Sequence, residues 1–161
     1  MANLKYYREE RAKYPWHSEY MVNADEALQI CFRAFWVHGL PPLKLDFNRR
    51  DGSGFFRWSW FKGMVQKTNT ISLSSVTSIR TILHEIAHYM DYLNRVREMA
   101  KIDPTGQNGF GAEMIGASTC RRIRKEHFHG PRHKVEMAKL IKWFDEDYRK
   151  YDMAVDTAKA A

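Results

Sequence analysis

The chain carries Ile82-Leu83-His84-Glu85-Ile86-Ala87-His88-Tyr89-Met90, in which a His-Glu-x-x-His motif lies inside an apolar run. Side chains four positions apart lie on the same face of a helix, so His84 and His88 can reach one metal ion. A catalytic zinc takes three protein ligands and keeps a fourth position for water, whose pKa it lowers to about 7. Glu85 lies beside both histidines and can accept a proton from that water as general base. The motif predicts two zinc ligands and a base within one helical turn.

Apolar side chains around the motif recur at steps of three and four residues, which is the pattern of one buried helix face. They are Ile79, Ile82, Leu83, Ile86, Met90, Leu93 and Val96. Thr77 or Ser78 can cap this helix, which we expect to end near Arg97 or Met99. The two histidines lie at the edge of the apolar face, where a cleft can form. The alternative is that both are ordinary core or surface residues.

The composition is that of a folded globular protein. The 161 residues fit one domain, and 44% of them are hydrophobic and 14% aromatic. The net charge of +7 favours polyanionic partners, although charge alone does not establish them. No apolar run is long enough to cross a bilayer and the first residues lack a signal-peptide pattern, so we expect a cytoplasmic protein. Cys31 and Cys120 cannot make a four-thiolate zinc site.

Short strands are predicted between the first third of the chain and the motif helix. Residues 43–47 and 70–74 alternate apolar and polar side chains, and residues 55–61 form a strongly aromatic run. Turn-forming residues separate the three segments. We therefore expect a small antiparallel or mixed three-stranded sheet.

Helical segments are predicted on both sides of these strands. A short helix followed by a loop is expected within residues 3–20, and a helix capped by Asn23 or Asp25 should run to Gly39. Residues 112–125 have a helical pattern, and Pro131 suits the first turn of a last helix ending near Tyr151. The tail from Met153 should fray. Helices that flank a small sheet make this an α+β fold.

The third zinc ligand should come from the segment around His127-Phe128-His129-Gly130-Pro131-Arg132-His133. His129 would project from the start of the last helix, where it can meet the motif helix if the two pack side by side. Spacing does not separate His129 from His133 as the ligand.

These two motifs resemble those of the SprT-like zinc metallopeptidases, the group that contains bacterial SprT and the eukaryotic Spartan proteases. In that family a His-Glu-x-x-His helix is followed by a His-Gly-Pro element whose histidine is the third zinc ligand. The resemblance implies a single zincin-like domain over residues 1–161, with zinc held by His84, His88 and His129. It covers roughly residues 25–145, and its specific part is the two short motifs.

The chain departs from the family pattern at three places. The gap between His88 and His129 is longer than in compact members, so that about residues 95–128 are expected to be an insertion. Arg132 and His133 stand where an acidic and an aromatic residue are common, which leaves His133 as an alternative ligand or a transition-state donor. No cysteine follows Cys120 in the sequence, so we expect no zinc ribbon of the kind that many SprT-type proteins carry. Any DNA targeting would then come from the domain surface.

The predicted function is that of a zinc-dependent peptidase in which Glu85 activates water. The oxyanion donor stays open among Tyr89, Tyr92, His127, Arg132 and His133. Asp91 either orients a ligand or is an exposed helix carboxylate. By resemblance, the substrate would be protein associated with DNA.

Two other functions are compatible with the same motif. A nucleic-acid-binding module with a structural zinc and no turnover would need a fourth protein ligand, for which His127 and His133 are candidates. A hydrolase acting on small molecules or nucleic acids would use the same activated water, because the motif does not specify its target.

Overall fold

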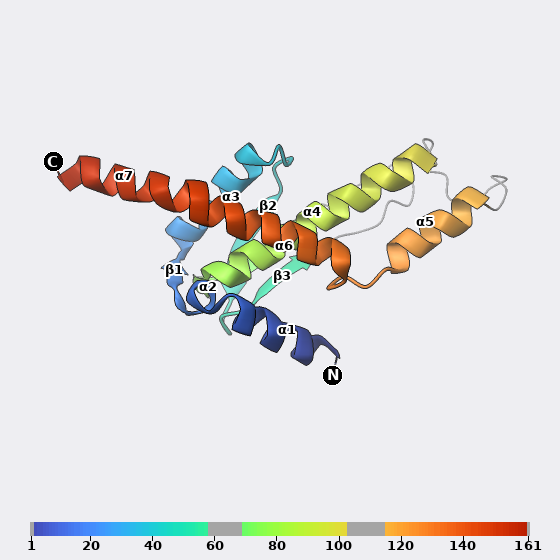
Figure 1. Ribbon diagram of the computed structural model, residues 1–161, viewed down its shortest axis with the longest axis horizontal. Helices are drawn as coiled ribbons and strands as arrows, with labels where there is room; N and C mark the ends of the chain where they lie inside the picture. Colours follow the sequence, from blue (N-terminus) through green and yellow to red (C-terminus); the bar gives the residue numbers. More distant parts are fainter. Residues whose placement is uncertain (1, 58–68, 103–114, 161) are drawn as a thin grey trace.

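Helix α4 (Ile79–Ile102) runs through the middle of the molecule, beside the sheet and beneath α6 (Pro131–Trp143) (Figure 1). The computed structural model describes residues 2–57, 69–102 and 115–160. Ser78 caps α4, because its Oγ accepts a hydrogen bond from the backbone N–H of Thr81 at 3.2 Å. The motif helix is therefore present, with its start as predicted and its end slightly later.

The chain is α+β, as predicted. Its helices are α1 (Ala2–Lys13), α2 (Pro15–Glu19), α3 (Ala24–Val37), α4, α5 (Ile115–Lys125), α6, the π-helical turn η1 (Phe144–Tyr148) and α7 (Arg149–Ala160). Its strands are β1 (Met21–Asn23), β2 (Lys44–Arg49), β3 (Gly54–Arg57), β4 (Thr70–Ser74) and β5 (Val76–Ser78).

The three predicted strands form a mixed sheet in the order β2-β4-β3. β4 lies in the middle, parallel to β2 and antiparallel to β3. The second half of the predicted aromatic strand, residues 58–61, lies outside the described residues. β3 packs against α4, so the sheet edge and the motif helix lie together. A second, two-stranded sheet of β1 and β5 was not predicted, because three-residue strands carry too little periodicity.

The segment before β1 contains two helices instead of one helix and a loop. α1 and α2 fold back on the C-terminal part of the chain, where His17 Nε2 hydrogen-bonds to Asp145 Oδ1 at 2.8 Å. α3 begins with a capping box in which Asn23 and Glu26 satisfy each other's backbone N–H groups. Asn23, not Asp25, is therefore the cap.

The last helix begins at Pro131 as predicted, then continues through η1 and α7 to Ala160. The segment from Met153 belongs to α7 in the structure, and its fraying stays a prediction. The predicted helix over residues 112–125 begins at Ile115 in the structure, and residues 112–114 lie outside the described part. That about residues 95–128 are an insertion stays a prediction.

The core lies where α3, α4, α6 and the inner face of the larger sheet meet. Its fully buried side chains include Ala27, Cys31, Ala34, Ile71, Leu73, Ile82, Leu83, Ile86, Ala87 and Leu140. α4 contributes most of its first three turns to this core, which places the motif at the interface of sheet and helices. In residues 2–57, 69–102 and 115–160, no helix is both long and apolar enough to span a bilayer.

Candidate metal centre

The Nε2 atom of His88 lies close to the Nε2 atoms of two other histidines beside α4. His84 and His88 lie one turn apart, with 3.1 Å between their Nε2 atoms. His129, from the connection that precedes α6, places its Nε2 3.1 Å from that of His88. Tetrahedral zinc with Zn–N bonds of about 2.0–2.1 Å holds its ligand atoms about 3.3 Å apart. Both distances to His88 are close to this separation.

His133 is a fourth member of what we call the histidine cluster (His84, His88, His129 and His133). His84, His88 and His133 are buried and offer ligand atoms within 4.8 Å of one another, so these three are also close enough to bind a metal ion. The Nε2 of His133 donates to the carbonyl oxygen of His84 at 3.2 Å. Its Nδ1 lies 2.9 Å from the hydroxyl of Tyr6. As a ligand, His133 would have to give up one of these contacts.

Glu10 of α1 orients His84 from the side opposite the cluster. Its carboxylate oxygens lie 2.9 and 3.0 Å from Nδ1 of His84. Burial alone would raise the pKa of Glu10, but hydrogen bonds from His84, Tyr6 and Arg80 hold this pKa at about 2. Because an ionised carboxylate only accepts hydrogen bonds, Nδ1 of His84 carries the proton. Its Nε2 lone pair is then free to face a metal.

The cluster favours neutral imidazoles, which is the form that binds metal. Burial, followed by the neighbouring histidines, lowers the pKa of His88 well below its usual value. Burial likewise lowers the pKa of His129 to about 4 and that of His133 to about 3. All three would be uncharged near neutral pH.

Two tyrosines of α1 cover the cluster. The ring of Tyr6 stacks on that of His129, with 4.5 Å between centroids and 20° between planes. Its hydroxyl donates to Glu10 Oε2 at 2.7 Å. Tyr7 contacts the rings of His84 and His129 at centroid distances of 5.3 Å. Tyr6, Tyr7 and Glu10 of α1 were not predicted as part of the site. The only signal in the sequence was the spacing of Tyr6 and Glu10, which puts them on one helix face.

Glu85 lies on α4 beside the cluster and faces β3. Its side chain is buried, and the loss of hydration raises the pKa of its carboxyl to about 7, while the backbone N–H of Phe56 donates a hydrogen bond that opposes this rise. Gly54 allows the strand to come this close, because a Cβ at that position would lie 2.6 Å from Cγ of Glu85. A carboxyl with such a pKa can exchange a proton near neutral pH.

Asp91 does not orient a histidine and is not exposed. Both of its oxygens accept hydrogen bonds from Arg95, at 2.8 Å each, in an ion pair that is almost fully buried. Arg95 also donates to the carbonyl oxygens of Ile123 and Glu126 at 3.0 and 2.9 Å. The pair thus ties the segment that carries His129 to α4.

Several residues considered as oxyanion donors have other partners. The hydroxyl of Tyr89 donates to the Pro41 carbonyl oxygen at 2.7 Å, on the core side of α4. Arg132 is paired with Glu98 and Glu126 at 2.7 and 2.6 Å.

His127 and Tyr92 are two further residues that were predicted as possible oxyanion donors. Nδ1 of His127 accepts from the backbone N–H of His129 at 3.1 Å, and the ring lines a cavity next to the cluster. Tyr92 packs against Phe56, with ring centroids 5.9 Å apart. Tyr7, which was not predicted, lines the same cavity as Glu85 and His84, and its ring centroid lies 5.3 Å from that of His84.

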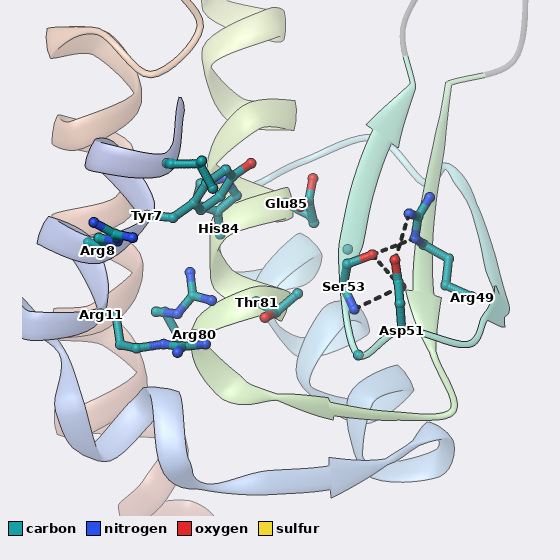
Figure 2. A pocket seen from close by; sticks show the side chains of 13 residues that line it. Tyr7, Arg8, Arg11, Arg49, Asp51, Ser53, Arg80, Thr81, His84 and Glu85 are labelled. Carbon is teal, nitrogen blue, oxygen red and sulfur yellow. Dashed lines mark hydrogen bonds and ion pairs between the residues drawn. The ribbon is translucent and has the colours of Figure 1, made fainter. Parts of the chain in front are cut away.

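Two cavities open on either side of Glu85. One, of about 560 Å³, lies between α1, the β2–β3 turn and the first turns of α4 (Figure 2). The other, of about 420 Å³, is lined by β3, His88 and the segment 125–129. Tyr7, Gly54 and Glu85 line both cavities. Glu85 and three histidines of the cluster, His84, His88 and His129, thus line cavities.

Comparison with known proteins does not place the chain in a family. No family model, no curated protein and no solved structure matches it. The assignment of a function consequently depends on the geometry of the site.

Proposed function

We propose that the protein is a zinc-dependent peptidase with a zincin-like fold, in which His84, His88 and His129 hold the metal and Glu85 is the general base. The observation that carries this proposal is that the Nε2 atoms of His84 and His129 each lie 3.1 Å from that of His88, next to a buried carboxyl. His129 is preferred over His133 because the nitrogens of His133 already contact the His84 carbonyl and Tyr6.

Zinc bound there would supply an activated water and polarise the scissile carbonyl. Glu85 would take a proton from that water and pass it to the leaving amine, a role that its raised pKa suits. Glu10 would keep His84 in the tautomer whose Nε2 is free. Tyr7, which lines the same cavity as Glu85 and His84, is a candidate to donate its hydroxyl proton to the developing oxyanion.

A peptide substrate is supported by the position of β3. In the described part of the chain β3 pairs with β4 on one side, and its residues line the cavity that contains His88 and His129. An extended peptide can add to such a strand edge through backbone hydrogen bonds. It would then pass over Glu85.

The test begins with Glu85→Gln. This variant should bind one zinc per chain and lose about 10²–10⁴-fold in peptide hydrolysis, because it keeps the shape of the side chain and removes the base. Zinc content by atomic emission and hydrolysis of a casein-like substrate are measured on the same preparation. Full activity in Glu85→Gln would eliminate this residue as the base.

The ligand assignment is tested with His129→Ala and His133→Ala. We expect zinc to be lost with His129→Ala and kept, with weaker affinity, in His133→Ala. The opposite pattern would move the third ligand to His133 and leave the peptidase proposal standing.

The structural-zinc alternative requires a fourth protein ligand, for which His127 and His133 are the candidates. Its support is that His133 lies within ligand distance of His84 and His88. Visible spectra of the cobalt-substituted protein separate the two cases. An open site changes its spectrum when a hydroxamate is added, whereas a closed site does not.

Association with DNA stays a prediction that draws on the net charge of +7 and the SprT-like resemblance. Titration with single- and double-stranded oligonucleotides at low salt, where phosphate contacts are strongest, tests it. Absence of binding under these conditions would remove DNA-associated proteins from the proposed substrates.

A further inference from the structure

The larger cavity next to Glu85 has arginine side chains on opposite walls. Figure 2 shows Arg8 and Arg11 of α1 and Arg80 of α4 on one side, and Arg49 of β2 on the other. We call this the arginine cavity. Its inner end is formed by His84 and Glu85, so a group bound in it would lie next to the proposed site of hydrolysis.

The positive charge of this cavity is only partly compensated. Arg80 Nη1 donates to Glu10 at 2.8 Å, but its buried Nε has no hydrogen-bond partner among the described residues. Arg49 contacts Asp51 at 3.3 Å and Ser53 at 2.7 Å.

Arg8 and Arg11 are the remaining arginines of the wall. Their side chains have no ion pair with another residue in ranges 2–57, 69–102 and 115–160. Against four arginines, the cavity lining contains two acidic residues, Asp51 and Glu85. An anionic group would gain charge-assisted hydrogen bonds here.

We propose that the arginine cavity is a specificity subsite for an acidic side chain of the peptide substrate, next to the bond that is cleaved. This inference rests on the proposed peptidase function. The guanidinium fork matches a carboxylate in geometry. The cavity of about 560 Å³ accommodates an aspartate or glutamate side chain, and it lies between α1 and the β2–β3 turn (Figure 2).

The experiment compares otherwise identical peptides with Glu, Gln or Lys at each position flanking the cleaved bond. We expect the Glu peptide to be cleaved with a kcat/KM at least 10-fold above the Gln peptide at one of these positions. The variant Arg8→Glu/Arg11→Glu should abolish this preference or reverse it in favour of Lys. Arg49→Gln, on the opposite wall, should reduce the preference for Glu without disturbing α1.

The matched control is Lys5→Glu/Lys13→Glu, which makes the same change of charge on α1 outside the arginine cavity. It should keep the wild-type preference. Zinc content and Tm of each variant show whether the site remains folded.

A second measurement is independent of turnover. Fluorescence polarisation of the zinc-free protein with labelled Glu and Gln peptides should show tighter binding of the Glu peptide, and the difference should vanish in Arg8→Glu/Arg11→Glu. Equal binding and equal cleavage of the two peptides would overturn the subsite while leaving the peptidase intact. Cleavage of no peptide would instead refute the proposed function. Loss of oligonucleotide binding in Arg8→Glu/Arg11→Glu, with the peptide preference unchanged, would make the cavity a phosphate site and overturn the inference.

Discussion

At the scale of single residues, the histidine cluster depends on groups outside the zinc motif. Glu10 fixes the proton of His84, Tyr6 stacks on His129, and Gly54 leaves room for Glu85. Each of these three residues lies directly against the side chain that it affects. Each can therefore be tested by one substitution.

Glu10→Ala should weaken zinc binding by about 10–100-fold, because His84 loses the carboxylate that orients it. Glu10→Gln should lie between Glu10→Ala and wild type, since an amide oxygen can still accept from Nδ1. Competition with a chromophoric chelator measures the affinities. Glu9→Ala, at an exposed neighbouring position, is the control and should bind zinc normally. Wild-type affinity in Glu10→Ala would contradict this role.

Gly54→Ala should reduce kcat/KM by about 10²-fold while zinc is retained. The new Cβ would meet Cγ of Glu85 at 2.6 Å and Cγ2 of Thr81 at 2.8 Å, so the base or the strand must shift. Adding Thr81→Ser removes one of the two clashes and should restore part of the activity. Unchanged kinetics of Gly54→Ala would show that the β3–α4 contact tolerates a methyl group.

At the scale of elements, the connection between α5 and α6 is held by α4. The buried pair of Asp91 and Arg95 lies one turn beyond the motif, and Arg95 reaches backbone carbonyls that precede His129. The segment that carries His129 is thereby positioned by the helix that carries His84 and His88.

Arg95→Met should lower the free energy of unfolding by about 3–5 kcal/mol, because it leaves the Asp91 carboxylate buried and unpaired. Urea denaturation in the presence of a chelator measures this without a contribution from zinc. Arg97→Met, on an exposed position of the same helix, should change stability little. If the free energy of unfolding of Arg95→Met fell by less than about 1 kcal/mol, water would have to hydrogen-bond to the Asp91 carboxylate in place of Arg95.

At the scale of the whole molecule, the histidine cluster joins α1, α4 and the start of α6, which are distant in sequence and adjacent in space (Figure 1). A metal that binds only this assembled arrangement stabilises the folded chain over the unfolded one. The same metal should thus serve both catalysis and stability.

Zinc at about 100 times its dissociation constant should stabilise the fold by about 2.7 kcal/mol. For a chain of this size the expected rise in Tm is about 5–10 °C, measured by calorimetry with and without a chelator. In His129→Ala the rise should be largely lost. Identical Tm values for the wild type with and without zinc would argue against a metal in the cluster.

The local features of this protein could be predicted from its sequence. The start of α4, the start of α6, the start of α3 and the three strands of the larger sheet follow from patterns within a few neighbouring residues, although the choice of Asn23 over Asp25 as the cap of α3 required the structure. The placement of His84, Glu85 and His88 within one turn follows from helix geometry in the same way. Short strands such as β1 and β5 carry too few residues for a pattern, which is why they were missed.

Contacts between distant segments required the tertiary structure. Glu10 and His84 are 74 positions apart, and no periodicity or motif marks α1 as the cover of the histidine cluster. The proposal of His129 rather than His133 as third ligand draws on what their nitrogens contact in the folded chain. The physical reason is that sequence patterns reflect which face of an element is buried, whereas the meeting of two faces depends on the path of the chain between them.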